Sequence, residues 1–130
     1  MTEKNLFLVF SNPTTGREPE YNEWYDSTHV HEVLDVPGVV AAQRYALAPM
    51  DIPEVEGAPS PPPPAHRYLA VYELESDPNE VMAEFLRRLT TGEMTLHEGL
   101  DMATVSMSTW RPRGDRLDAP STDATAAGAR

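Results

Sequence analysis

The placement of proline constrains this chain more than any other feature of its sequence. Seven of its 13 prolines lie between Pro49 and Pro64, and the last four of these are consecutive. A proline run lacks backbone donors and prefers the polyproline II conformation, which excludes helix and interior strand. We therefore expect residues 48–66 to form a long loop that joins two hairpin strands. The acidic stretch DIPEVEG before the proline run disfavours the alternative of a polyproline ligand motif.

The segments on both sides of this connection have the pattern of four strands and two helices. Short apolar runs bounded by turn-forming residues predict strands over residues 6–10, 39–47, 67–74 and 103–110. Apolar residues at helical spacing predict helices over residues 17–35 and 77–89. The order β-α-β-β-α-β is that of a ferredoxin-like α+β fold, in which two helices cover one face of a four-stranded antiparallel sheet.

Local signals mark the ends of both helices. Pro19 suits the first turn of the first helix, where a missing N–H has no helical partner to lose. Pro37-Gly38 marks the end of that helix. The second helix begins with Asp77 as its cap and Glu80 three residues on, which is the spacing of a capping box.

Two helices cover only one face of such a sheet, yet apolar residues occur on both faces of the strands. In the first strand, Phe7 and Val9 alternate with Leu6, Leu8 and Phe10. An apolar face of this size is unstable in water unless something covers it. We therefore predict a homodimer whose two sheets pack face to face.

The length and composition predict one domain without cysteine chemistry. The chain has 130 residues and a mass of 14.4 kDa, which is the size of a single domain. We assign this domain to residues 1–112. Residues 113–130 are small and polar without apolar periodicity, and they predict a disordered tail. The absence of cysteine excludes disulfides, thiolate nucleophiles and iron–sulfur clusters. No apolar run approaches the roughly 20 residues of a membrane span and no signal-peptide pattern is present, so we expect a cytoplasmic protein.

The charge of the chain narrows the classes of partner. Ten basic residues against 21 acidic residues give a net charge of −11. Nucleic acids and anionic membranes both require cationic side chains that displace counterions. The sequence therefore predicts a protein that binds neither nucleic acid nor membrane.

The helix over residues 17–35 carries the most informative side chains. Its aromatic residues share one side at about 100° per residue, whereas Val30 and Leu34 point elsewhere. One straight helix cannot bury all of these residues, so we predict a break near His29 to His31. His29 lies one turn after Tyr25 on nearly the same face. A titratable imidazole beside aromatic rings at an irregular helix predicts a functional site.

Several residues of this helix and of the following strand form one pattern: Trp24-Tyr25-Asp26-x-x-His29, then Leu34, Pro37-Gly38 and Arg44-Tyr45. Over about residues 4–110, the chain resembles the EthD-like family of the dimeric α/β-barrel superfamily. The resemblance implies a ferredoxin-like fold that dimerises through its sheets, with a pocket between sheet and helices in each subunit. Relatives include polyketide cyclases, muconolactone-type isomerases, small cofactor-free monooxygenases and haem-modifying enzymes. Many members carry proline two positions after the histidine, where this chain has His31.

His29 is the candidate catalytic residue, acting as a general base. Neutral imidazole accepts a proton from an acidified C–H or O–H group and returns it elsewhere. We therefore predict a cofactor-independent lyase or isomerase, of cyclase or dehydratase type, acting on a hydrophobic aromatic or polyketide-like carbonyl compound. A phenolic O–H would stabilise the developing enolate, and a carboxylate would orient the imidazole. The side chains expected to bind the substrate are those of Trp24, Tyr25, Asp26, Tyr45 and Tyr72.

Two other classes of function remain open from the sequence. The same pocket suits a non-catalytic small-molecule-binding homodimer, or a small cofactor-free or haem-handling monooxygenase. We predict no cofactor. We also predict no metal site, because His29 and His31 diverge on a helix and cannot bind one metal ion together. Nothing in the sequence brings His97, Glu32 or Glu98 to either of them. The expected partners are a small hydrophobic molecule and a second copy of the chain.

Overall fold

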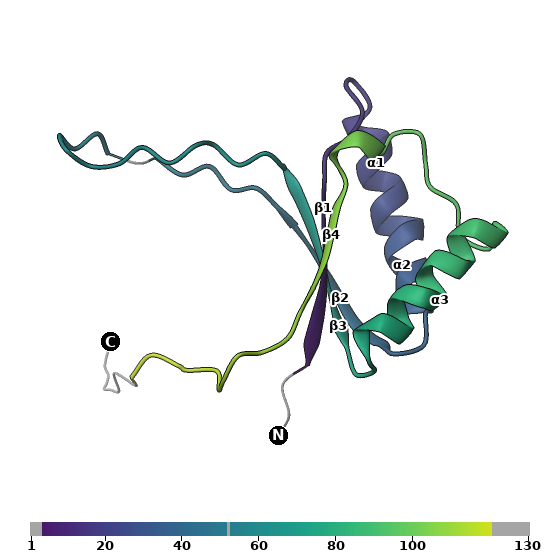
Figure 1. Ribbon diagram of the computed structural model, residues 1–130. Helices are drawn as coiled ribbons and strands as arrows, with labels where there is room; N and C mark the ends of the chain where they lie inside the picture. The colour runs from purple at the N-terminus through teal and green to yellow at the C-terminus, as the bar shows by residue number, and fades with distance from the viewer. Residues whose placement is uncertain (1–3, 52, 121–130) are drawn as a thin grey trace.

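The computed structural model describes residues 4–51 and 53–120. Its elements follow the predicted β-α-β-β-α-β order (Figure 1). The strands are β1 (Asn5–Ser11), β2 (Val39–Ala46), β3 (Tyr68–Leu74) and β4 (Ser106–Trp110). The helical elements are α1 (Glu18–Trp24), the π-helical turn η1 (Tyr25–His29), α2 (Val30–Leu34), α3 (Pro78–Thr91) and the 3₁₀ turn η2 (Met102–Thr104).

The sheet has the strand order β2-β3-β1-β4, and each neighbouring pair is antiparallel. α1, η1 and α2 follow one another without a gap and form one helical segment. This segment and α3 lie on the same side of the sheet (Figure 1). The predicted α+β class, with a four-stranded antiparallel sheet and two helices, is confirmed, and it is compatible with a ferredoxin-like fold.

Most element ends lie within two residues of their predicted positions, but two features differ by more. The last strand begins at Ser106 rather than at residue 103, because the preceding residues form the 3₁₀ turn η2. The side chain of Asp101 caps this turn by accepting a hydrogen bond from Ala103 N–H at 3.1 Å. The irregularity in the first helix lies at η1, mostly ahead of the predicted position, and the helix continues through it as α2. The helix therefore widens by one residue instead of breaking.

The core lies between the sheet and the helices and is built from aromatic rings. Phe7 of β1 is fully buried, and its ring centre lies 5.6 Å from those of Tyr72 on β3 and Phe85 on α3. Tyr21 of α1 is fully buried as well, and its hydroxyl shares a hydrogen bond with Ser11 at 2.7 Å. These contacts join two strands to both helical segments. They stabilise the core because each large ring buries much apolar area.

The side of the sheet that faces away from the helices carries a second row of apolar side chains. Phe7 and Tyr72 are paired in register and buried under the helices, so their sequence neighbours point the other way. At the edges of this other face, Tyr45 of β2 and Trp110 of β4 are 48% and 57% exposed. The open face, as we call it, is formed at its centre by Leu6, Leu8, Phe10, Leu69 and Val71.

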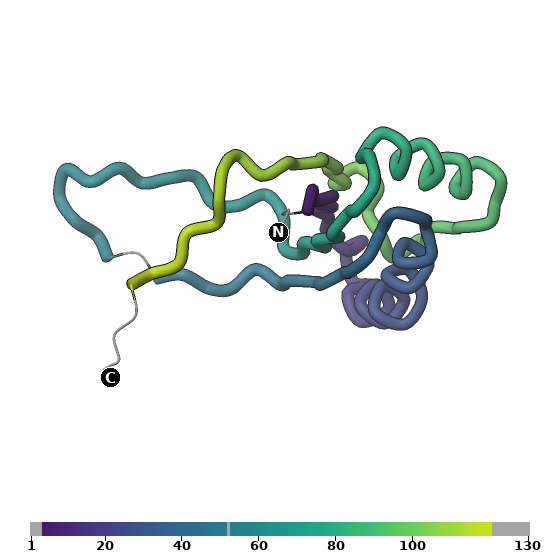
Figure 2. Tube along the Cα trace, turned by 90° about the horizontal axis from the view of Figure 1, so that it is seen from below, coloured from purple at the N-terminus to yellow at the C-terminus, as the bar shows by residue number. Residues whose placement is uncertain are grey.

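The connection between β2 and β3 is a long arm, residues 47–67, that leaves the sheet on the side away from the helices (Figures 1 and 2). Its root is paired, because Leu47 N–H donates to the carbonyl of Arg67 at 2.7 Å. Arg67 N–H in turn donates to the side chain of Asn12 at 2.7 Å. Beyond this root the described residues are exposed and contain neither helix nor strand, as the prolines predict.

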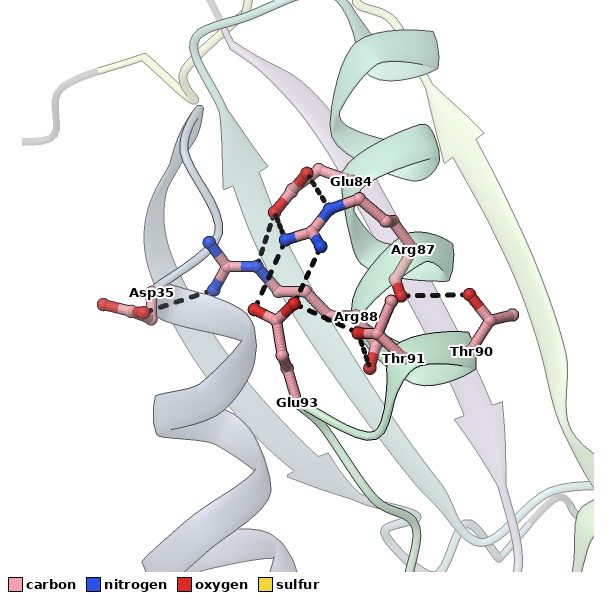
Figure 3. Close-up of polar contacts among 7 residues, drawn as sticks. All are labelled: Asp35, Glu84, Arg87, Arg88, Thr90, Thr91 and Glu93. Carbon is pink, nitrogen blue, oxygen red and sulfur yellow. Dashed lines mark hydrogen bonds and ion pairs between the residues drawn. The ribbon is translucent and has the colours of Figure 1, made fainter.

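Both ends of α3 are fastened by polar side chains. At its start, Asp77 accepts a hydrogen bond from Asn79 N–H at 3.0 Å, which is the predicted cap. Near its end, Arg88 donates to Glu84 at 2.7 Å and to Asp35, the residue after α2, at 3.2 Å (Figure 3). These contacts hold the end of α3 beside the end of α2. Because the ion pairs are partly or largely exposed, they orient the two helices more than they stabilise the fold.

The C-terminal part of the chain leaves the sheet after β4. Residues 113–120 are exposed and form neither helix nor strand, whereas the rest of the predicted tail, 121–130, lies outside the described residues. Over residues 4–51 and 53–120, no helix combines the length and apolar character needed to cross a membrane.

Candidate functional site

The π-helical turn η1 sets the position of the candidate base. Val30 N–H donates to the carbonyl of Tyr25, five residues back, so this turn holds one residue more than an α-helical turn. With this spacing, Tyr25 and His29 both point into the core, where they are 2% and 4% exposed. Such single π-turns within α-helices are frequent at functional sites.

Aromatic rings and one carboxylate surround the imidazole of His29. Trp24 stacks on it with ring centres 4.6 Å apart and an angle of 19° between the planes. Tyr25 meets it edge-on at 5.0 Å. On the helix itself, Nδ1 of His29 lies 3.5 Å from Oε1 of Glu32, and neither of these buried atoms has a closer hydrogen-bond partner. A hydrogen bond from Nδ1–H to this carboxyl group would require the tautomer that has its lone pair on Nε2.

Burial keeps His29 uncharged. Desolvation, with the nearby positive charge of Arg44 as the second cause, lowers the pKa of His29 from 6.5 to about 4. Burial also raises the pKa of the Glu32 carboxyl. At neutral pH the imidazole is therefore a proton acceptor and not a cation.

His29 lines a cavity of about 70 Å³ between the helices and the covered face of the sheet. The walls come from β1, β3 and β4, from the helical segment and α3, and from the connection that precedes β4. They are apolar except for the side chains of Tyr25, His29 and Tyr72. A small apolar space with a few converging polar groups is the usual form of a small-molecule site.

The hydroxyl of Tyr72 is the most unusual polar group in this cavity. It is buried and makes no hydrogen bond of regular geometry, although the hydroxyl of Tyr25 lies close enough to affect its pKa. Burial first, and then the neighbouring Tyr25, raise the pKa of Tyr72 well above its ordinary value. Burial likewise raises the pKa of Tyr25 to about 12. Both phenols therefore keep their protons at neutral pH and can donate hydrogen bonds.

Arg44 of β2 contacts the π-helical turn η1 from the side of the sheet. Its guanidinium carbon lies 4.2 Å from the ring centre of Tyr25, a cation–π contact. Its Nη1 donates to Asp26 at 2.8 Å. Asp26 thus pairs with Arg44, and the carboxylate beside the imidazole is that of Glu32.

The structure brings together only some of the predicted substrate-binding residues. Tyr25 and Tyr72 line the cavity with His29, and Trp24 covers the imidazole without lining that cavity. Tyr45 lies on the open face, at a separate hollow of about 370 Å³ beside the root of the arm. Adjacent strand residues alternate in direction, so Arg44 points to the helices and Tyr45 away from them.

Two side chains of the site were missed by the sequence analysis as functional residues. Glu32 was considered only as a metal ligand, although its position three residues after His29 places it on the same helix face. Arg44 belongs to the pattern that resembles the EthD-like family, but its contact with Asp26 could not be predicted because it depends on how β2 lies under the helix. Among the described residues, no group of three histidine or acidic side chains is arranged to hold a metal ion.

Comparisons of the chain with protein-family models, with curated proteins and with solved structures found no match. The EthD-like resemblance therefore stays a prediction from the motif that contains Trp24, Tyr25, Asp26 and His29.

Proposed function

We propose that the cavity binds a small, mostly apolar carbonyl compound and that His29 moves a proton on it, as in a cofactor-independent lyase or isomerase. The observation that carries this proposal is the Tyr72 hydroxyl, buried without a partner in the same cavity as a neutral imidazole. Leaving a buried polar group unpaired costs about 1–3 kcal/mol, so most buried polar groups in proteins are paired. A ligand oxygen would accept the missing hydrogen bond.

The proposed chemistry moves one proton and involves no net oxidation. Nε2 of His29 takes a proton from a carbon beside the carbonyl group, and the electron pair of that C–H bond forms an enolate. The enolate oxygen accepts a hydrogen bond from the hydroxyl of Tyr72 or Tyr25. The imidazolium then returns the proton to another carbon, which shifts a double bond, or to a leaving hydroxyl, which departs as water. Either step restores neutral His29.

The low basicity of His29 limits the substrates that it can deprotonate. A base with a pKa of about 4 is fully unprotonated at neutral pH but accepts protons weakly. It suits a carbon whose proton is acidified twice, by two carbonyl groups or by a carbonyl and a double bond. Cyclisation and dehydration of polyketide-like compounds pass through such carbons, and this is the substrate class that we propose.

The cavity must enlarge to accept a ring. Its volume of about 70 Å³ is below the roughly 150 Å³ of an engineered cavity that holds benzene. Met102 and Met107 line it and are 58% and 45% exposed, so they form its outer rim. Methionine side chains are unbranched and adapt to irregular shapes. We propose that movement of these two side chains admits the ligand.

A carrier or sensor that binds the same compound without chemistry is the second candidate. The observation that favours it is the weak basicity of His29 itself. In this case the neutral imidazole and the two phenols would hold the ligand oxygen and hydroxyl groups by hydrogen bonds alone.

One experiment separates these candidates. The protein is incubated with 3-cyclohexen-1-one, a compact β,γ-unsaturated ketone, and formation of the conjugated isomer is followed by ultraviolet absorbance. Binding is followed in parallel by protein NMR, using signals of residues that line the cavity. Isomerisation above the buffer rate supports the enzyme, whereas cavity binding without isomerisation supports the carrier or sensor. Absence of both effects, with this ketone and with aromatic ketones, would contradict the proposed function.

Replacing Tyr72 by phenylalanine is expected to stabilise the free protein and weaken ligand binding. The variant removes an unpaired buried hydroxyl, so the free energy of unfolding should rise by about 1 kcal/mol. Ligand affinity should fall about tenfold, because one hydrogen bond to the ligand is lost. Urea denaturation and calorimetric titration measure the two effects. Tyr21→Phe is the matched control: its hydroxyl is bonded to Ser11, so this variant should be less stable than the wild type.

We also propose that the chain forms a homodimer through the open face. The support is the row of apolar side chains at the centre of that face. Within the described residues, no helix lies on this side of the sheet (Figure 1). Sedimentation velocity at micromolar concentration tests this, and a monomer would contradict it.

A further inference from the structure

The arm, residues 47–67, makes few contacts with its own subunit. Its described residues from 48 to 65 are all exposed, including the apolar Met50 and Val55, which are 75% and 61% exposed. The polar contacts that fasten it lie at its root, where Asn12 binds the backbone of Ala65 and Arg67. The arm is therefore held to its own subunit only at its root, and the rest of its described length is free to contact another molecule.

The arm and the C-terminal segment, residues 111–120, leave the sheet from opposite ends. β3 begins next to the end of β1, where Tyr68 pairs with Ser11, so the arm joins the sheet there. β4 ends next to the start of β1, where Trp110 pairs with Leu6. Both segments then extend to the side of the sheet that faces away from the helices (Figures 1 and 2). They flank the space in front of the open face.

Over the residues that the structure describes, the arm carries unpaired acidic side chains, whereas the C-terminal segment carries two unpaired arginines, one unpaired aspartate, Asp115, and the ion pair between Arg116 and Asp118. Asp51, Glu54 and Glu56 lie on the arm, are exposed, and have no ion-pair partner among the described residues. Arg111 and Arg113 of the C-terminal segment are exposed and likewise make no ion pair within the described part of the chain. The other arginines between residues 4 and 110 all pair with carboxylates of their own subunit; they are Arg17, Arg44, Arg67, Arg87 and Arg88.

We infer that the arm of each subunit reaches across a second copy of the chain and docks on the partner's C-terminal segment. This inference rests on the proposed homodimer and adds the orientation of its subunits. A two-fold axis that runs between the sheets and across the strands places the arm of one subunit at the C-terminal segment of the other. Asp51, Glu54 and Glu56 then face the partner's Arg111 and the partner's Arg113, twice in the dimer.

Charge selects this orientation over the alternative. A two-fold axis parallel to the strands would place arm beside arm and would bring six acidic side chains together. Like charges brought together at an interface disfavour the pairing, whereas complementary patches fix its register. The C-terminal segment is also the one part of the described chain in which arginines, Arg111 and Arg113, make no ion pair within their own subunit and can therefore bind the acidic arm.

Charge reversal in two separate variants tests the inference. The arm variant carries Asp51→Lys, Glu54→Lys and Glu56→Lys, and the tail variant carries Arg111→Glu and Arg113→Glu. Each variant alone is expected to have a dimer Kd at least about tenfold higher than the wild type at low salt, because several ion pairs become repulsive. In an equimolar mixture, the two variants should form heterodimers with near wild-type affinity, since each arm then meets an oppositely charged segment.

The outcomes distinguish this contact from the other possibilities. Analytical ultracentrifugation gives the Kd values, and native mass spectrometry counts heterodimers against homodimers. A control variant with Glu23→Lys, Glu75→Lys and Glu80→Lys makes the same change in net charge outside the arm and should not favour heterodimers with the tail variant. Unchanged Kd values would overturn the inference. So would the absence of a heterodimer preference, which is the result expected if the arm contacts its own subunit. Both results would leave the homodimer intact. A monomeric wild type would overturn both.

Discussion

Replacing His29 by glutamine is expected to slow the proposed proton transfer by about 10²–10⁴-fold, the usual effect of removing a general base. Glutamine keeps a polar group near the position of Nε2 but cannot accept a proton at neutral pH. Affinity for the carbonyl compound should change little by comparison, because the apolar walls and the two phenols remain. The variant therefore separates chemistry from binding, and absorbance and NMR titration measure the two quantities.

The pH profile of the wild type adds a second test of the same residue. Because burial lowers the pKa of His29 to about 4, kcat/KM should rise up to about pH 4 and stay level from pH 5 to 8. An imidazole with its ordinary pKa of about 6.5 would still lose activity at pH 6. The rise of kcat/KM up to about pH 4 should be absent from the residual activity of His29→Gln, because the group that titrates there is gone.

His31→Gln is the matched control for this experiment. His31 is exposed and lies two residues further along the same helix, so its replacement removes an imidazole without changing the cavity. We expect wild-type kinetics for this variant. Equal losses in the two variants, or wild-type kinetics for His29→Gln, would contradict a catalytic role for His29.

Acidification is expected to destabilise the wild type through His29. The unfolded chain binds a proton at this residue with a pKa of 6.5, whereas the folded chain does so only at about 4. Between these values the unfolded state holds more protons, so the free energy of unfolding falls as the pH falls. From pH 7 to pH 5, the loss due to His29 should be about 2 kcal/mol. Below about pH 3, where both states bind this proton, His29 causes no further loss.

Urea denaturation of three proteins at both pH values measures this loss. The ion-paired carboxylates titrate in the wild type, in His29→Gln and in His31→Gln alike, so their contribution cancels between them. The loss between pH 7 and pH 5 should be about 2 kcal/mol smaller for His29→Gln and unchanged for His31→Gln. If all three proteins lose the same free energy, His29 is not held neutral by burial.

The order of the elements could be predicted because its signals are local. The apolar run of β1, the cap at Asp77 and the stop at Pro37-Gly38 each depend on residues within a few positions of one another. The start of β4 was placed too early because Ala103 and Val105 continue the strand pattern. The hydrogen bond from Ala103 N–H to Asp101 bends the chain into η2 before the strand begins.

The candidate site could be predicted only in part. The spacing of Tyr25 and His29 indicated a shared face, and both line the cavity. Tyr45 was placed with them because its strand was known but its register under the helices was not. One residue of shift reverses the direction of a strand side chain, so this choice depends on pairing with a distant strand.

The sequence by itself determined the elements, their order and the irregular helix that carries His29, since these follow from backbone preferences and apolar spacing over short stretches. Only the tertiary structure decided that Glu32 and Tyr72 accompany the imidazole, that Arg44 pairs with Asp26, and that the arm leaves the sheet on the open side. The physical reason is distance along the chain. Burial, the lowered pKa of His29 and the unpartnered hydroxyl of Tyr72 arise where segments far apart in sequence pack together, and no local pattern records that packing.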